Sequence, residues 1–463
     1  MALEPARVVS QVRCRHTVPG MPRSSAAAIS IALAAAAAMM ATSTFAAGRP
    51  SPDEALRRLT SENEFSGAVV IRSARGVDFA RGYGMADPFT GRGFTPDTPV
   101  DSGSLAKPVT AAAILMLSRD GKLDLDSPVR RYLPEYPYEQ GTIRDLLAHS
   151  AGLPVEQMLA PLDDKSNAMF LAEMSSRKLP TLFPPGTAIV YCNICYTTLA
   201  LLIERVSGRP YLEFVRERLA LPAAVTIRPA RLADWKDRAI GYRLVEGGKL
   251  ERADSYENEI FYGAANLSIS AAQLAQWGSE WWQPRLAPIA ETATTPASIA
   301  GKTSGLSWGN WYCASGGRRC HYLGHHEGFH HMLYWDRDRK VSVAMVSNNT
   351  LSPTLQQRLQ RALIAFSEDQ GAAAEKELAA PLPDNPVVPG TYRFPNGETV
   401  FVGTKGELVF VNRGGLPYLA FRLGAGIRYV PGLDVYLAGA EGGGLHWLSA
   451  YEDGVAAPVA GPG

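Results

Sequence analysis

Strand-like segments stand at both ends of a long region of this chain, and helical patterns fill the stretch between them. Residues 67–72 and 75–84 alternate between apolar and polar side chains and break at glycine, which is typical of a β-hairpin. Strand-like runs return at residues 331–335 and 341–347, and an amphipathic helix follows at 355–366. Strands so far apart in the chain predict one sheet built from distant segments, with a helical subdomain inserted between them.

The first helix of this inserted region has a well-defined start. Apolar residues recur with helical spacing over residues 105–117. Pro108 is tolerated only in the first turn of a helix, so the helix begins just before it. Ser104 is therefore expected at a helix N-terminus. Further helical patterns cover residues 196–206 and 271–282.

The N-terminal segment has the layout of a secretory signal peptide. Arg23 precedes an apolar, alanine-rich run at residues 26–40 and a stretch of mostly small residues at 41–47. A membrane-spanning helix is the alternative, but about 20 strongly apolar residues are needed to cross a bilayer. We expect cleavage near Ala46, a secreted or periplasmic protein, and no stable membrane span afterwards. Met21 is an alternative start of the signal peptide.

Charge and cysteine content follow from that cleavage. The formal charge of +1 for the whole chain becomes −2 after removal of residues 1–46, so neither nucleic acid nor an anionic membrane is indicated as a partner. Four cysteines remain, an even number in an oxidising compartment. Cys313 and Cys320 flank a turn-like stretch, and whether they form a disulfide stays open. Cys192 and Cys195 have the spacing of a redox motif but are interpreted as small buried residues.

A second, smaller domain is expected at the C-terminus. Residues 371–389 are rich in alanine, proline and charge and are interpreted as a linker. Short alternating strands divided by glycine turns follow and favour a small β-barrel or sandwich. The expected divisions are a signal peptide at 1–46, a main domain at 47–370, the linker at 371–389 and a β-domain at 390–463.

Ser104 and Lys107 form a candidate catalytic pair. Acyl transfer by a serine needs a hydroxyl, a base within hydrogen-bond reach and amide donors for the developing oxyanion. Residues three apart on a helix share a face, so Lys107 would lie beside the Ser104 hydroxyl. Ser175 and Lys178 have the same spacing, but they lie in a polar stretch without a preceding strand and are interpreted as surface residues.

The surroundings of Ser104 carry a more specific signal. The runs at residues 101–115, 121–129 and 143–154 resemble the class C β-lactamase-related serine hydrolases in order and spacing, and the resemblance covers residues 53–366. The resemblance implies an α+β fold of the β-lactamase/transpeptidase type, with an antiparallel sheet flanked by helices. The C-terminal β-domain resembles the lipocalin-like appendages of some of these hydrolases.

The family's second element, Tyr-x-Asn, is present as Tyr191-Cys-Asn193, and an apolar helix follows it. Tyr256-Glu-Asn258 has the same pattern without such a helix. The resemblance implies that Tyr191 shares proton transfer with Lys107 and that the Asn193 amide contacts the substrate. An acyl-enzyme on Ser104 would then form without a metal or an organic cofactor, and a small-molecule or peptide acyl substrate is expected.

The third element, a Lys-Thr-Gly or His-x-Gly on an edge strand, has two candidate registers. His326-Glu-Gly328 fits directly, and the Phe329 amide would then join that of Ser104 in the oxyanion hole. The other register makes His325 the motif residue. Lys302-Thr-Ser304 lacks the glycine and comes too early. A histidine here is neutral for most molecules at pH 7, which favours esters or D-amino-acid peptides over β-lactams.

The same residues are compatible with two rival functions. Zinc could be bound by a histidine cluster, whose members are His321, His325, His326, His330 and His331. Adjacent histidines on a strand point to opposite faces, so no metal site is expected. His149 is interpreted as a structural hydrogen-bonding residue. A non-catalytic peptidoglycan- or peptide-binding module is the other alternative, but it would not need a nucleophile beside its base. The oligomeric state stays open.

Overall fold

The computed structural model describes residues 51–463 apart from 156–157, 159–165, 246–248, 255–260, 380–384, 406–407, 424–425, 451–452 and 460–463. The predicted signal peptide and the Tyr256–Asn258 pattern lie outside the described residues. The described residues belong to one compact unit. None of the helices described is long and apolar enough to cross a membrane.

The main domain is built on a six-stranded antiparallel sheet, ordered β12-β13-β14-β15-β1-β2. The strands are β1 (Gly67–Ser73), β2 (Gly76–Tyr83), β12 (Tyr312–Ala314), β13 (Arg319–His326), β14 (Phe329–Asp336) and β15 (Val341–Ser347). The N-terminal hairpin joins the C-terminal strands through β1 and β15, which pair from Gly67 with Ser347 to Ser73 with Val341. One sheet therefore forms from distant segments, as predicted.

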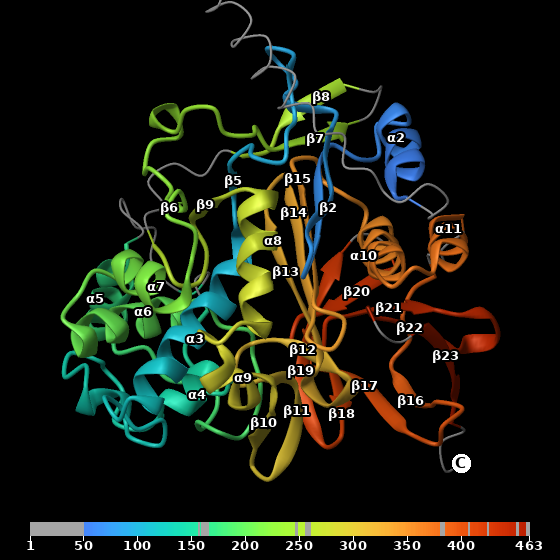
Figure 1. Cartoon of the computed structure of the whole chain (residues 1–463). Coiled ribbons are helices and arrows are strands. Elements are labelled where there is room, and N and C mark those ends of the chain that lie inside the picture. The colour runs from blue at the N-terminus through green and yellow to red at the C-terminus, as the bar shows by residue number, and fades with distance from the viewer. Residues whose placement is uncertain are drawn as a thin grey trace, which may run out of the picture. The chain divides into compact units, whose positions relative to one another are not determined.

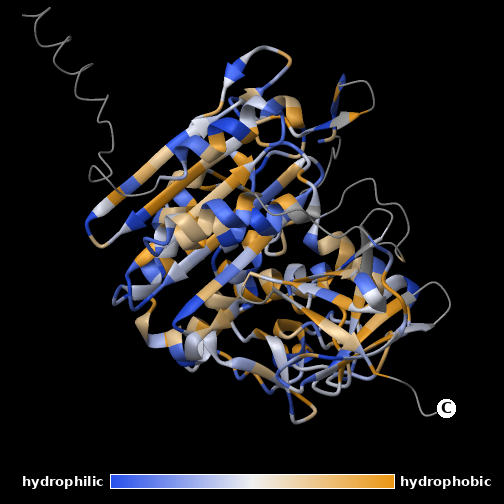
Figure 2. Ribbon diagram, turned by 90° about the vertical axis from the view of Figure 1, so that its right-hand side faces the viewer, coloured by the Kyte–Doolittle hydropathy of each residue, from blue (hydrophilic) through white to orange (hydrophobic). Residues whose placement is uncertain are grey.

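Helices cover both faces of this sheet, so its strands are buried on both sides (Figure 1). Val70 and Ala344 belong to the core beneath α8 (Ala271–Ser279), and Val69 and Met345 to the core shared with α10 (Pro353–Ser367). Two further helices, α2 (Asp53–Ser61) and α11 (Gly371–Ala379), lie on the α10 side. Figure 2 shows hydrophobic residues running along the strands and hydrophilic residues at their ends.

A helical subdomain is inserted between β2 and β12, as predicted. Its helices are α3 (Ala106–Arg119), α4 (Ile143–Leu147), α5 (Asn167–Arg177), α6 (Asn193–Ser207), α7 (Tyr211–Leu219) and α9 (Ala287–Thr294). Helix α3 is buried from Ala106 through Leu117 and packs against α6, α7 and α9. Its alanines allow this close packing on every side. The α+β fold with a flanked antiparallel sheet is confirmed.

Short strands connect these parts. They are β3 (Met85–Asp87), β4 (Arg92–Gly93), β5 (Val100–Asp101), β6 (Thr226–Ile227), β7 (Tyr242–Val245), β8 (Lys249–Arg252), β9 (Leu267–Ile269), β10 (Pro296–Ile299) and β11 (Lys302–Ser307). Strand β9 lies between β5 and β6 in a three-stranded sheet. Because β5 ends just before Ser104, this small sheet fixes the backbone that enters the site.

The C-terminal region forms a closed antiparallel barrel, in which β16 and β23 pair with each other. Its strands are β16 (Gly390–Arg393), β17 (Thr399–Lys405), β18 (Leu408–Arg413), β19 (Leu416–Leu423), β20 (Ile427–Val430), β21 (Val435–Gly439), β22 (Leu445–Leu448) and β23 (Asp453–Pro458). The predicted linker at 371–389 is corrected at its start, where residues 371–379 form α11. Ala374 of that helix is buried against the α10 side of the sheet. Alanine, glutamate and lysine are strong helix formers, so this composition favours a helix there.

Both cysteine pairs are disulfides. Cys313 and Cys320 are paired positions of β12 and β13, and their bond answers the question that the sequence left open. Cys192 and Cys195 are buried, as interpreted, but they also form a disulfide, which that interpretation did not include. Residue 192 caps the N-terminus of α6 and residue 195 lies in its first turn, which brings the two side chains together.

A buried polar pair joins the barrel to the main sheet. The His321 ring on β13 contacts the Asp434 carboxylate at 2.5 Å (Nε2 to Oδ2), and both side chains are 1% exposed. Tyr429 of β20 donates a second hydrogen bond to Asp434, at 3.1 Å. Nearby, the Tyr312 hydroxyl donates to the Pro431 carbonyl. These contacts hold the β20–β21 hairpin against β12 and β13.

We expect Asp434→Ala to lower the free energy of unfolding by about 3 kcal/mol, because removing one partner of a buried pair leaves the other unpaired. Asp338→Ala is the matched control, since Asp338 pairs with Arg318 in an exposed position. The control should cost less than about 1 kcal/mol. Urea unfolding of both variants measures the difference, and equal small losses would show that the pair does not secure the barrel.

Candidate active site

Ser104 lies in a single 3-10 turn, Gly103–Leu105, that leads directly into α3. Lys107 follows in the first turn of α3, and its side chain is fully buried. The Lys107 Nζ donates a hydrogen bond to the Ser104 Oγ at 3.1 Å. The spacing of three residues therefore brings the hydroxyl and the amine together, as predicted.

The Lys107 amine is held by three oxygen atoms. Besides Ser104, it donates to the Asn193 Oδ1 at 2.6 Å and to the Ala264 carbonyl at 3.0 Å. Asn193 is the first residue of α6, and Ala264 precedes β9. Helices α3 and α6 and the β9 loop thus fix the Lys107 amine between them. These contacts hold the Lys107 side chain in one conformation, with its Nζ beside Ser104.

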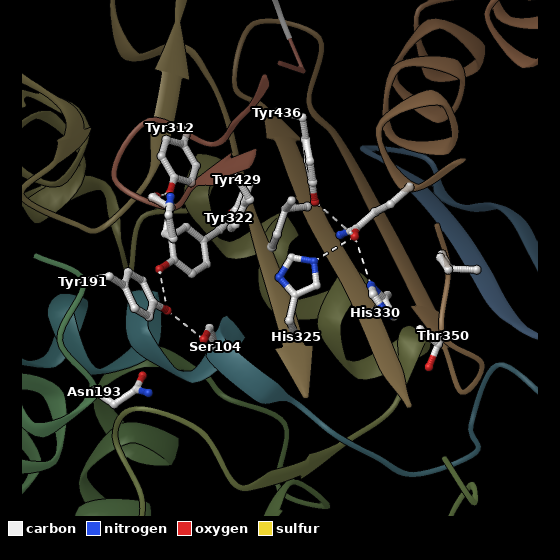
Figure 3. A pocket seen from close by; sticks show the side chains of 14 residues that line it. Ser104, Tyr191, Asn193, Tyr312, Tyr322, His325, His330, Thr350, Tyr429 and Tyr436 are labelled. Atoms are coloured by element: carbon white, nitrogen blue, oxygen red, sulfur yellow. Dashed lines mark hydrogen bonds between the residues drawn. The ribbon is translucent and has the colours of Figure 1, made fainter. Parts of the chain in front are cut away.

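Tyr191 reaches the same hydroxyl from the other side. It precedes α6, and its Oη donates to the Ser104 Oγ at 2.7 Å (Figure 3). The Lys107 Nζ lies 4.7 Å from the centre of the Tyr191 ring. The structure therefore brings Ser104, Lys107, Tyr191 and Asn193 into one cluster, in which two groups can exchange a proton with the nucleophile.

A series of neutral side chains, linked by ring stacking and hydrogen bonds, supports Tyr191. The His149 ring stacks on the Tyr191 ring with 4.7 Å between centres. Burial lowers the pKa of His149 to about 3, so its ring is neutral. Its Nδ1 accepts from the Cys192 N–H at 3.0 Å, which leaves Nε2–H to donate to the Asn310 Oδ1 at 3.2 Å. Asn310 donates to the Tyr322 Oη at 2.9 Å, and Tyr322 lies 3.4 Å from the Tyr191 Oη.

A buried carboxylate secures the turn that carries Ser104. The Asp101 Oδ1 accepts from the N–H groups of Gly103, at 2.9 Å, and Asn266, at 3.2 Å. Arg228 and His326 face the other oxygen, at 3.0 and 3.5 Å. Burial raises the pKa of Asp101, but His326, Arg228 and the Gly103 N–H outweigh it and keep the pKa below its usual value. Asp101 is therefore a charged anchor beneath the nucleophile.

The backbone of Asn266 is left-handed, with φ of 65°. Asparagine tolerates this region better than most residues. The turn therefore keeps a conformation suited to glycine, and the carbonyl of nearby Ala264 still reaches Lys107.

Strand β13 passes the nucleophile at Gly324 and His325. A Cβ added to Gly324 would lie 2.4 Å from the Ser102 carbonyl oxygen, and one added to Gly103 would lie 2.7 Å from the His325 carbonyl oxygen. Only glycine allows two backbones to approach this closely. The backbone of His325 therefore lies beside that of Ser104.

The structure corrects the register of the third element. His326 contacts Asp101, Gly328 lies in the β13–β14 turn with φ of 74°, and Phe329 is fully buried beside Gly241. None of these three lines the cavity at Ser104. The β13–β14 turn is tight, so residues 326–329 lie beyond the point where β13 passes Ser104. Lys302 lies on β11 and donates to the Gly415 carbonyl of the barrel.

Sequence reasoning missed Tyr322 and Gly324 as the residues beside Ser104. They have the spacing of the lysine and glycine in Lys-Thr-Gly, and that spacing was the available signal. His325, the alternative of the second register, does line the cavity. Ser175 does not line the cavity. Its hydroxyl instead bonds to the backbone carbonyls of Leu171 and Glu135.

Ser104 opens into a cavity of about 570 Å³. Its lining comes from the turn before α3, from α6, α10, the strands β12, β13 and β14 with nearby loops, and from the barrel. The lining residues are Ser104, Tyr191, Asn193, Tyr312, Tyr322, Leu323, His325, His330, Thr350, Leu351, Gln356, Tyr429, Pro431 and Tyr436. Lysine and arginine are absent from this set of described residues. Burial lowers the pKa of His325 and takes that of His330 to about 3, so neither ring supplies a positive charge. The cavity is aromatic and uncharged, and the barrel forms part of its wall.

Among the residues that the structure describes, no group of three or more histidine, cysteine, aspartate or glutamate side chains is placed to hold a metal ion. The histidines of the cluster are instead separated by their strand positions. His321 contacts Asp434, His326 contacts Asp101, and His331 bonds to the Asp101 carbonyl at 2.7 Å.

Comparisons with known proteins agree with this geometry. The family model described as Beta-lactamase matches residues 52–366. The chain is 31% identical to Esterase EstB of Burkholderia gladioli over 39% of this chain and 52% of the esterase, and 32% identical to the D-aminopeptidase of Brucella anthropi over 34% and 31%. The matches thus span about half or less of these relatives. The octameric penicillin-binding protein homologue from Pyrococcus abyssi has a similar fold, with a TM-score of 0.58, 19% identity and coverage of 87% and 98%.

Proposed function

This chain belongs to the β-lactamase family of serine acyl hydrolases, and we propose that it hydrolyses esters or amides of uncharged acyl groups through an acyl-enzyme on Ser104. One observation carries the proposal. The Ser104 Oγ receives hydrogen bonds from both Lys107 and Tyr191, and it lines a largely aromatic cavity. A nucleophile held between two proton-transfer groups is the arrangement that acyl transfer requires.

Acylation begins with loss of the Ser104 proton. The neutral Lys107 amine or the Tyr191 phenolate can take that proton, and both lie within hydrogen-bond distance of Oγ. The Oγ then bonds to the substrate carbonyl carbon, and the carbonyl becomes an oxyanion. Asn193 holds Lys107 in place through its Oδ1, and its Nδ2 is free for the substrate side of the site.

The oxyanion needs N–H donors that are already in place. The N–H of Ser104 lies at the start of α3, where the helix dipole favours negative charge. The His325 backbone lies beside it, and its N–H is the second donor in our proposal. Each such donor contributes on the order of a hundredfold to the rate.

Collapse of this intermediate breaks the bond to the leaving group. Tyr191 passes its proton to the departing oxygen or nitrogen, which gives an alcohol or an amine and leaves the acyl group on Ser104. Water, deprotonated by the same pair of residues, then attacks the ester carbonyl and releases the acid. The His149–Asn310–Tyr322 chain keeps the Tyr191 hydroxyl in position during both steps.

We also propose that the protein acts outside the cytoplasm, in the periplasm or as a secreted protein. The signal-like segment at residues 1–46 supports this location. The two disulfides agree with it, since such bonds persist mainly in oxidising compartments.

Incubation of the folded protein with a fluorophosphonate tests the nucleophile. We expect a single label on Ser104, found by mass spectrometry of the digested protein, because among the described hydroxyls only this one has both proton-transfer partners. Ser104→Ala should remove the label, and Ser175→Ala should leave it unchanged. A folded protein that takes no label would instead support the non-catalytic binding module.

A further inference from the structure

We infer that the acyl arm of the cavity ends in a neutral hydrogen-bond donor, the Gln356 side-chain amide, which selects uncharged acyl groups that carry a carbonyl acceptor along their chain. This inference rests on the proposed function, because it assigns the acyl specificity of the same site. The acceptor would be an amide or ester carbonyl.

The position of Tyr191 defines the acyl arm. A group that protonates the leaving group must lie on the leaving-group side of Ser104. Figure 3 shows His325 and His330 on the opposite side of Ser104 from Tyr191. The acyl chain therefore extends from Ser104 toward these two histidines, and Gln356 of α10 lines the cavity beside them.

Gln356 is fixed by three donors. Its Oε1 lies 2.8 Å from the His325 Nε2, 3.0 Å from the His330 Nδ1 and 3.3 Å from the Tyr436 hydroxyl. An amide carbonyl can only accept, so both rings carry their proton on the nitrogen that faces it. Tyr436 belongs to β21, and the barrel therefore takes part in fixing this amide.

The other end of the same amide has no partner. The Gln356 side chain is buried, and its Nε2 forms no hydrogen bond in the structure. Buried polar groups in folded proteins almost always have partners, so an unpaired donor on a side chain that lines the cavity indicates a place for a ligand acceptor. A substrate carbonyl that binds there would satisfy this donor.

The charge of the cavity limits what that acceptor can be. A carboxylate would have to leave water for a pocket whose described lining contains no lysine or arginine. His325 and His330 do not become cations easily, because burial lowers the pKa of both. A neutral carbonyl loses much less solvation on entry. The site therefore favours an amide or ester over an acid at the same position.

The test compares matched p-nitrophenyl esters of straight-chain acids, over several chain lengths. At each length one ester ends in a primary amide, one in an alkyl group of the same size and one in a carboxylate. At the best length we expect kcat/KM for the amide to exceed that for the alkyl ester by on the order of tenfold, and the carboxylate to be the poorest. A wild-type enzyme without preference for the amide at any length would overturn the inference.

Two variants locate the preference. Gln356→Met removes the amide, and Gln356→Glu keeps its shape while replacing the nitrogen by oxygen, so both should abolish the preference for the amide ester. Gln357→Met is the matched control, because Gln357 is equally buried on α10 but does not line the cavity. Fluorophosphonate labelling of Ser104 confirms that each variant is folded. If the wild type is labelled and hydrolyses all esters alike, only this inference fails; if it is neither labelled nor active, the proposed function fails.

Discussion

Replacing Lys107 by alanine is expected to lower the rate of Ser104 acylation by on the order of a thousandfold. The reason is geometric, since Lys107 is fully buried and its Nζ lies 3.1 Å from the nucleophile. Water that enters the vacated space is a much weaker base than an amine. Stopped-flow measurement of p-nitrophenol release, or the rate of fluorophosphonate labelling, gives the loss directly.

Lys178→Ala provides the control for this variant. Lys178 stands three residues after Ser175, as Lys107 does after Ser104, but it caps α5 with an exposed side chain. Its loss should leave acylation unchanged. If Lys107→Ala acylates at close to the normal rate while circular dichroism shows a native fold, Tyr191 alone would be the base and Lys107 would leave the mechanism.

The parts of this molecule that depend on neighbouring residues could be predicted from the sequence. Strand alternation marked β1, β2, β14 and β15, and helical spacing placed Ser104 at the start of α3. The proximity of Ser104 and Lys107 follows from one turn of helix. Tyr191 and Asn193 were found through their family motif, because nothing in the local pattern brings α6 to α3.

The remaining parts depend on contacts between distant segments. The point at which β13 passes Ser104 is set by backbone packing at Gly103 and Gly324, which the spacing of histidines does not reveal. Gln356 is paired with His325, His330 and Tyr436, residues that lie 31, 26 and 80 positions away along the chain. No periodicity in the sequence carries that information. The barrel was predicted as a fold, but the residues that it adds to the cavity wall, Tyr429, Pro431 and Tyr436, were not.

The third element of this chain has no lysine, and a large effect on the turnover of β-lactams is expected from that difference. A β-lactam presents a carboxylate, and relatives with Lys-Thr-Gly offer a fixed positive charge for it. Here Tyr322 has the spacing of that lysine relative to Gly324. It is buried and hydrogen-bonded to Asn310, and burial raises its pKa far above the usual value. Its hydroxyl is therefore neutral at pH 7. The cavity also has no lysine or arginine among its described lining residues.

We therefore expect kcat/KM for penicillins and cephalosporins to be at least about a hundredfold below that for short-chain p-nitrophenyl esters, because an unpaired carboxylate pays its desolvation without compensation. Tyr322→Lys should recover part of the loss, and Tyr322→Met separates the added charge from the lost phenol. The ratio of penicillin to ester turnover should rise about tenfold or more in Tyr322→Lys relative to Tyr322→Met. Efficient cephalosporin hydrolysis by the wild type would mean that the carboxylate is held by a group outside this cavity, and an unchanged ratio would mean that position 322 does not face it.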